Sequence, residues 1–175
     1  LKDYILEKGR LPKTNEIFED NKLIEKFKSY KSAFDILNRI YPKLDIREIA
    51  KKRKEDYLLF MSLEAFNGRS KLNTLPVETQ NDIKEFFTNY KTAKQESDAL
   101  LFSIGDPLVI RDKINKCTVG KKTQEALYIH IDAIDNTDSV LRLYEGIARQ
   151  YLGQPEGNIV KFPYDKKSIS YHNYP

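Results

Sequence analysis

Apolar residues recur every three or four positions from Leu1 to about Cys117, which is the spacing of one face of an α-helix. Proline, glycine and asparagine residues interrupt this pattern and divide it into about six helices. The clearest predicted helix begins at Asn21, an N-cap residue type, and stops at Pro42. Further predicted helices of this part span residues 45–66, 77–88, 90–104 and 107–116.

After Gly120 the apolar spacing shortens to two residues. Leu127, Ile129 and Ile131 alternate with polar side chains, which predicts a half-buried β-strand. The elements predicted to follow are a helix capped by Thr137 or Asp138 and a β-hairpin with strands at 158–162 and 168–174. The pattern therefore predicts a mainly α protein with a small α+β C-terminal part: a bundle-like helical body over residues 1–117, and a strand, a helix and a hairpin over 118–175 packed on it.

Two segments of the helical part echo each other. Residues 27–33 read FKSYKSA and residues 87–93 read FTNYKTA, and a Leu-Pro pair precedes each of them, at 11–12 and 75–76. Two copies with unequal spacers fall short of a solenoid repeat. The echo predicts only that the two halves of the helical part pack similarly.

Composition narrows the class of protein. The chain has 175 residues, of which 40% are hydrophobic, and a formal net charge of +4, which permits a local basic surface without requiring one. Its single cysteine, Cys117, excludes an intramolecular disulfide and a multi-thiolate metal site and favours a reducing cytoplasm. No apolar run is long enough for a membrane-spanning helix. We expect a cytoplasmic protein without a membrane partner and, because it begins at Leu1 with Met61 as its only methionine, part of a longer chain.

The sequence offers few groups for catalysis. Neither GxGxxG nor GxxxxGK[ST] occurs, so no residue is assigned to cofactor binding or to a metal. If the predicted strand pairs with the hairpin, His130 and His172 share a sheet face with Asp132, an arrangement that suits acid–base chemistry. Surface histidines are more often structural, so a hydrolase or nuclease built on these three residues is the weakest hypothesis.

Clustered basic residues give a clearer indication of function than the candidate catalytic groups do. Arg47, Lys51 and Lys54 fall at i, i+4 and i+7 of the helix predicted from residue 45, which forms one positive stripe. Further basic pairs lie in predicted turns, at Lys121-Lys122 and Lys166-Lys167. These groups suit phosphate contacts with DNA. The alternative is a solvated helix face, because acidic residues at i,i+4 spacing neutralise part of the stripe.

The C-terminal strings are GKKTQEALYIH at 120–130, LRLYEGIAR at 141–149, EGN at 156–158 and SISY at 168–171. In this order they resemble the DNA phosphorothioation-associated putative methyltransferase family. The helical part resembles the same family through GRLP at 9–12, KRKED at 52–56 and the Leu-Pro pair at 75–76. The resemblance spans nearly the whole chain.

The resemblance implies a role in bacterial DNA modification and defence. In that family the S-adenosylmethionine motif, an Asp-Tyr-Gly-Cys-Gly type of strand end, lies upstream of the region that this chain resembles, and no residue here matches it. The chain is therefore expected to be a non-catalytic, DNA-binding accessory region of such a methyltransferase. The alternative is a helical scaffold for protein partners in a defence complex. His130 and Glu145, in the strings YIH and YEG, stay catalytic candidates on their chemistry alone.

Overall fold

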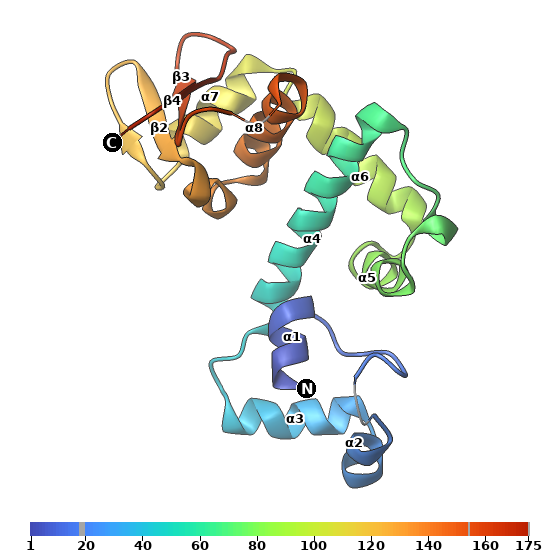
Figure 1. The fold of residues 1–175 in the computed structure, drawn as a ribbon. Coiled ribbons are helices and arrows are strands. Elements are labelled where there is room, and N and C mark those ends of the chain that lie inside the picture. The colour runs from blue at the N-terminus through green and yellow to red at the C-terminus, as the bar shows by residue number, and fades with distance from the viewer. Residues whose placement is uncertain (18–19, 154, 175) are drawn as a thin grey trace. The chain divides into compact units, whose positions relative to one another are not determined.

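The computed structural model describes residues 1–17, 20–153 and 155–174, which are mainly helical with a small sheet near the C-terminus (Figure 1). The expected fold class, mainly α with a small α+β C-terminal part, is confirmed. The chain forms two compact units: unit 1 comprises Leu1–Tyr57 and Ser70–Lys94, and unit 2 comprises Leu58–Arg69 and Gln95–Pro175. Among the described residues, no helix combines the length and the apolar character that crossing a bilayer requires.

Unit 1 is helical. Its elements are α1 (Lys2–Lys8), α2 (Asp20–Phe27), α3 (Tyr30–Ile40), the first part of α4 (Ile46–Glu64), the short 3-10 helix η2 (Leu72–Thr74), α5 (Val77–Phe87) and the start of α6 (Tyr90–Ser103). Gly9 ends α1 with φ +67°, and a Cβ there would lie 2.9 Å from the backbone of Ala50. Glycine thus allows the end of α1 to lie directly against α4.

The single helix predicted from Asn21 to Pro42 is wrong. The chain leaves the helix at Lys28, whose φ is +67°, and Ser29 then starts α3 by accepting a hydrogen bond from the Ser32 N–H at 3.1 Å. The apolar stripe continues through both helices, so the periodicity gave no sign of the break. A tight corner therefore joins α2 and α3.

The same corner occurs at the second copy of the echo. Thr88 ends α5 with φ +67°, and the Asn89 side chain accepts from the Thr92 N–H at 2.9 Å. Ala33 and Ala93, the last residues of the two copies, are both buried. The sequence echo thus corresponds to a repeated helix–turn–helix corner with matching backbone geometry and caps.

Unit 2 combines helices with a four-stranded antiparallel sheet of order β1-β2-β3-β4. Its other elements are the end of α4, η1 (Ala65–Asn67), most of α6, α7 (Pro107–Lys116), η3 (Ile131–Asn136) and α8 (Ser139–Leu152). The strands are β1 (Lys121–Lys122), β2 (Ala126–His130), β3 (Ile159–Pro163) and β4 (Ser170–His172). The predicted hairpin is confirmed as β3 and β4. The predicted strand ends one residue earlier than expected, and Lys121-Lys122 form an edge strand rather than a turn.

One face of the sheet packs against α7 and α8. Ile110 and Ile114 of α7 share a core with Leu127 of β2, Leu141 of α8 and Phe162 of β3. This packing places α7 in unit 2, whereas the sequence pattern placed residues 107–116 in the helical body. The compact units therefore do not follow the expected division at residue 117.

Candidate functional site

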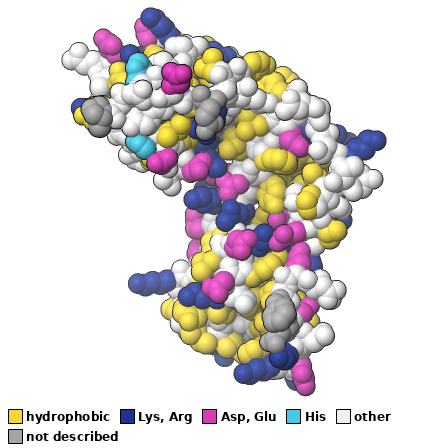
Figure 2. Space-filling view, viewed as in Figure 1, with side chains coloured by type: hydrophobic (Ala, Val, Ile, Leu, Met, Phe, Trp, Pro, Cys, Tyr) yellow, Lys and Arg dark blue, Asp and Glu magenta, His cyan; other side chains and the backbone are white. Residues whose placement is uncertain are grey.

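The sheet register brings the two histidines onto one face. His130 of β2 lies opposite Ile159 of β3, which lies opposite His172 of β4. Residues that face each other across strands point to the same side of a sheet. Since adjacent strands are about 4.8 Å apart, about 10 Å separates the strands that carry the histidines. Figure 2 shows both histidine side chains at the surface of unit 2.

Each histidine has its own polar neighbour. His130 Nδ1 accepts from the Asp132 N–H at 3.3 Å and lies 3.5 Å from Asp132 Oδ2. His172 Nε2 lies 2.9 Å from Ser170 Oγ. Within the described residues, no group of three or more His, Cys, Asp or Glu side chains is placed to hold a metal ion. Ile159 lies between His130 and His172 in the register of the sheet, so the two imidazoles do not form a catalytic pair.

Glu145, the other catalytic candidate, lies on the opposite side of the sheet. It is 3% exposed, and its Oε1 accepts from Arg149 Nε at 2.9 Å, Arg149 Nη2 at 2.8 Å and the Tyr171 hydroxyl at 3.0 Å. Burial, together with the adjacent carboxylate, raises the pKa of Tyr171 to about 12. Glu145 thus ties α8 to β4, and it does not join the histidines.

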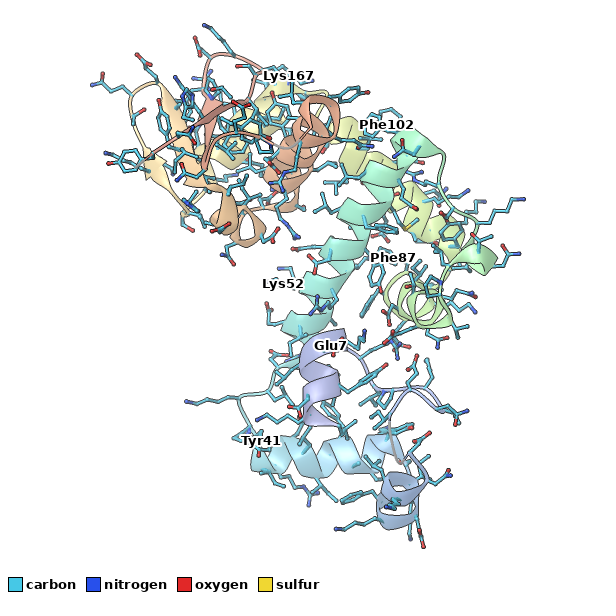
Figure 3. All side chains as sticks on the ribbon, viewed as in Figure 1. Glu7, Tyr41, Lys52, Phe87, Phe102 and Lys167 are labelled. Carbon is cyan, nitrogen blue, oxygen red and sulfur yellow. The ribbon has the colours of Figure 1, made fainter. Side chains whose placement is uncertain are left out.

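The basic stripe on α4 is only partly exposed. The Arg47 side chain is 90% exposed, with its Nε 3.5 Å from Asp45 Oδ1, and Lys51 is also exposed. Lys54 is half-buried, with its Nζ 4.9 Å from the centre of the Phe87 ring, which points toward α4 in Figure 3. Two of the three predicted cations, Arg47 and Lys51, are therefore open to an approaching phosphate.

The lysines of the predicted turns divide in the same way. Lys122 Nζ donates to the Asn115 carbonyl at 2.6 Å, and Lys167 Nζ donates to the Gly105 carbonyl at 3.2 Å. Lys121 and Lys166 are exposed. These four lysines belong to unit 2, whereas the α4 stripe belongs to unit 1, so the predicted DNA-binding residues are spread over both units.

The charge is unevenly distributed between the units. Asp and Glu slightly outnumber Lys and Arg in unit 2, so the positive excess of the chain lies entirely in unit 1. On the face drawn in Figure 2, basic and acidic side chains are interspersed. Long-range attraction of a polyanion is therefore a property of unit 1.

Unit 1 contains a buried ionic network that was not predicted from the sequence. Arg10 is 2% exposed; its Nε donates to Asp82 Oδ1 at 2.5 Å, and its Nη1 and Nη2 donate to Glu16 at 2.6 and 2.9 Å. The Tyr57 hydroxyl donates to Asp82, and the Tyr4 hydroxyl donates to Glu16 at 2.7 Å. Burial, aided by these carboxylates, raises the pKa of both tyrosines above the usual range.

This network is structural. The guanidinium of Arg10 has almost no accessible surface and already binds two carboxylates, so no ligand can reach it. It joins the segment after α1 to α5, across 72 residues of sequence. Arg10 belongs to the GRLP string at 9–12, which contributed to the family resemblance but did not indicate that Arg10 is buried or paired.

Acidification is expected to destabilise unit 1 through Glu16. Burial alone would raise its pKa, but hydrogen bonds from Arg10, the Lys13 N–H and Asn81 outweigh burial and hold the pKa well below the ordinary value of 4.5. In the unfolded chain Glu16 takes up a proton near that value, so its contribution is complete above about pH 4.5 and is lost as the pH falls further. Urea denaturation at a series of acidic pH values tests this. The Glu16→Gln variant should show a flatter pH dependence than the parent, and equal slopes would contradict the assignment.

No protein-family model, no curated protein and no solved structure matches this chain. The fold and the charge distribution define a two-unit protein, with a net-basic helical unit and an α+β unit built on an antiparallel sheet.

Proposed function

We propose that this chain is a non-catalytic region that holds duplex DNA for an S-adenosylmethionine-dependent DNA-modifying parent protein. The observation that carries the proposal is the repeated helix–turn–helix corner, of which both turns lie in the net-basic unit 1. Two helices joined by a tight turn are a common DNA-binding form. The family resemblance supports DNA as the partner, and it assigns the cofactor to a part of the parent outside these residues.

The phosphate contacts are assigned to exposed cations of unit 1. Lys31 and Lys91 occupy equivalent positions in the two corners, each one residue into its second helix, and both are exposed. Arg47 and Lys51 on α4 add two more exposed cations. Contacts of this kind position a duplex without reading its sequence, so weak sequence preference is expected.

The test is a salt titration of duplex binding with a quadruple variant that changes Lys31, Arg47, Lys51 and Lys91 to alanine. Each lost phosphate contact lowers the slope of log affinity against log salt by about 0.9, so a decrease of about 3–4 is expected, with much weaker binding at low salt. The control changes Lys8 and Lys13 of unit 1 and Lys113 and Lys116 of unit 2, which already form ion pairs with Glu78, Glu85, Asp138 and Asp112. It removes the same charge and should keep most of the slope.

The four lysines of unit 2 are tested separately. Changing Lys121, Lys122, Lys166 and Lys167 to alanine should lower the slope less, because two of these ammonium groups already donate to backbone carbonyls.

A protein-interaction scaffold is the second candidate, favoured by exposed apolar side chains in unit 2. Phe102 is 77% exposed, Leu108 71% and Tyr151 73%. Large apolar groups left in water are typical of surfaces that bind protein partners. If the quadruple variant of unit 1 binds duplex DNA as the parent does across the salt range, the DNA proposal fails and the scaffold replaces it.

A further inference from the structure

We propose that the outer face of the sheet in unit 2 binds an unpaired stretch of DNA, with a base stacked on Tyr128 and phosphates held by Lys121 and Lys161. The inference rests on the proposed DNA function and adds the form of DNA that unit 2 takes. The outer face consists of Lys121, Tyr128, His130, Ile159, Lys161, Ser170 and His172.

The register determines which side chains form this face. Lys121, Tyr128, Lys161 and Ser170 are successive partners across all four strands, and they form one row. His130, Ile159 and His172 form the next row. The alternate residues of the same strands, including Ile129, Val160 and Tyr171, point to the buried side. The outer face thus gathers an aromatic ring, two lysines and two imidazoles.

The chemistry of the row containing Tyr128 suits a single strand. The Tyr128 ring is partly exposed and belongs to a strand between those of Lys121 and Lys161, and Lys161 Nζ lies over one face of the ring, 5.6 Å from its centre, so a base would stack on the opposite face. Proteins that bind single strands combine cations that follow the backbone with aromatic rings on which the bases stack. His130 and His172 in the next row add planar groups that stack on a base or hydrogen-bond to its edge.

The charge of unit 2 favours unpaired DNA over a duplex. Unit 2 has slightly more acidic than basic side chains, and the Asp132 carboxylate beside His130 is 86% exposed. The dense phosphates of a duplex would meet this carboxylate without a compensating positive field. Stacking on an aromatic ring does not depend on net charge, so the salt dependence of single-strand binding should come from the phosphate contacts of Lys121 and Lys161, with a slope of log affinity against log salt of about 1.4 in magnitude.

Two glycines allow the chain to pass close to the strands of this face. A Cβ on Gly157 would lie 2.5 Å from the backbone nitrogen of His172, and a Cβ on Gly120 would lie 2.3 Å from the carbonyl oxygen of Tyr128. Gly120 also has φ +89°, a region that favours glycine. At Gly120 and Gly157 the chain therefore lies directly against the backbone of β2 and β4.

The chain contains no tryptophan, so a single introduced one reports on this face alone. In the full chain carrying Tyr128→Trp, oligothymidine is expected to quench the tryptophan emission, because a thymine stacks on the indole. A fully paired duplex at equal nucleotide concentration should leave the emission nearly unchanged. The matched control is Tyr151→Trp on α8, an exposed position that should respond to neither DNA. Equal quenching of both variants, or none at position 128, would overturn the inference.

Affinity gives a second test. Tyr128→Ser is expected to weaken oligothymidine binding at least about fivefold, as for the loss of one base–aromatic stack, whereas Tyr128→Phe keeps the ring and should bind as the parent does. Equal affinities of the Ser and Phe variants would reject stacking on Tyr128. Duplex binding by unit 1 should be the same in both variants. The two failures can be distinguished. If only this inference is wrong, the unsubstituted chain still binds duplex DNA; if the proposed function is wrong, the unsubstituted chain does not bind duplex DNA.

Discussion

Replacing Arg10 by methionine is expected to lower the free energy of unfolding of unit 1 by about 3–5 kcal/mol. Arg10 donates to Asp82 and to Glu16, and the side chains of these acids are only 5% and 12% exposed. Without the guanidinium, two carboxylates stay buried with no cation, and such uncompensated charges are strongly destabilising. The loss arises from the acids left behind rather than from the arginine itself.

Urea denaturation of the full chain, monitored through amide hydrogen exchange of residues in α1 and α5, measures this loss within unit 1. The control is Lys13→Met, which removes the ion pair between Lys13 and Glu85. The two side chains are 51% and 45% exposed, so losing this ion pair should lower the free energy of unfolding by less than about 1 kcal/mol. Combining Arg10→Met with Glu16→Gln and Asp82→Asn removes the buried charges together and should restore part of the stability. A loss for Arg10→Met no larger than for Lys13→Met would show that the network contributes little.

The fold class could be predicted from the sequence because its signals are local. The change of apolar spacing after Gly120 separates helices from strands, and the helix starts depend on single cap residues. Asp106 accepts from the Leu108 N–H at 2.9 Å before α7, and Asp138 accepts from the Val140 N–H at 2.9 Å before α8. Of the two cap residues predicted for α8 from residue type, Thr137 and Asp138, the structure has Asp138.

The break between α2 and α3 could not be predicted in this way. Glycine or asparagine usually marks a left-handed helix end, but here Lys28 and Thr88 adopt it. The sign was available only from comparing the two echoes, in which Ser29 and Asn89, both N-cap residue types, stand directly after these positions. A repeated N-cap within one apolar stripe indicates a corner that periodicity conceals.

The arrangement of the candidate functional residues depends on contacts between residues far apart in the sequence, which local patterns do not indicate. Arg10 and Asp82 meet across 72 residues, and α7 joins the sheet core through packing that no cap or period indicates. The shared face of His130 and His172 followed from pairing of the strand with the hairpin, whereas the inward position of Glu145 depended on the direction of α8. Local patterns thus supplied the candidate residues, and only long-range packing showed which of them meet.

Replacing Glu145 by leucine is expected to destabilise unit 2 by about 1–3 kcal/mol, because the Tyr171 hydroxyl loses its acceptor inside the protein. The Arg149 side chain is 39% exposed and can turn to water, so it adds little. Glu145→Gln keeps an oxygen acceptor and should cost less than Glu145→Leu. Denaturation of the two variants, compared with the parent, measures the difference.

The same pair of variants separates a structural Glu145 from a catalytic one through the ionisation of Tyr171. In the parent, the pKa of about 12 lies above the unfolded value of 10, so the stability linked to Tyr171 is complete below about pH 10 and is lost as the pH rises toward 12. Glu145→Gln removes the negative charge beside the hydroxyl, so the pKa of Tyr171 should fall and this alkaline loss should shrink. NMR titration of the Tyr171 ring measures the change. A pKa of Tyr171 that is the same in the parent and in Glu145→Gln would show that the carboxylate does not act on the hydroxyl, and it would contradict the role assigned to Glu145 in joining α8 to β4.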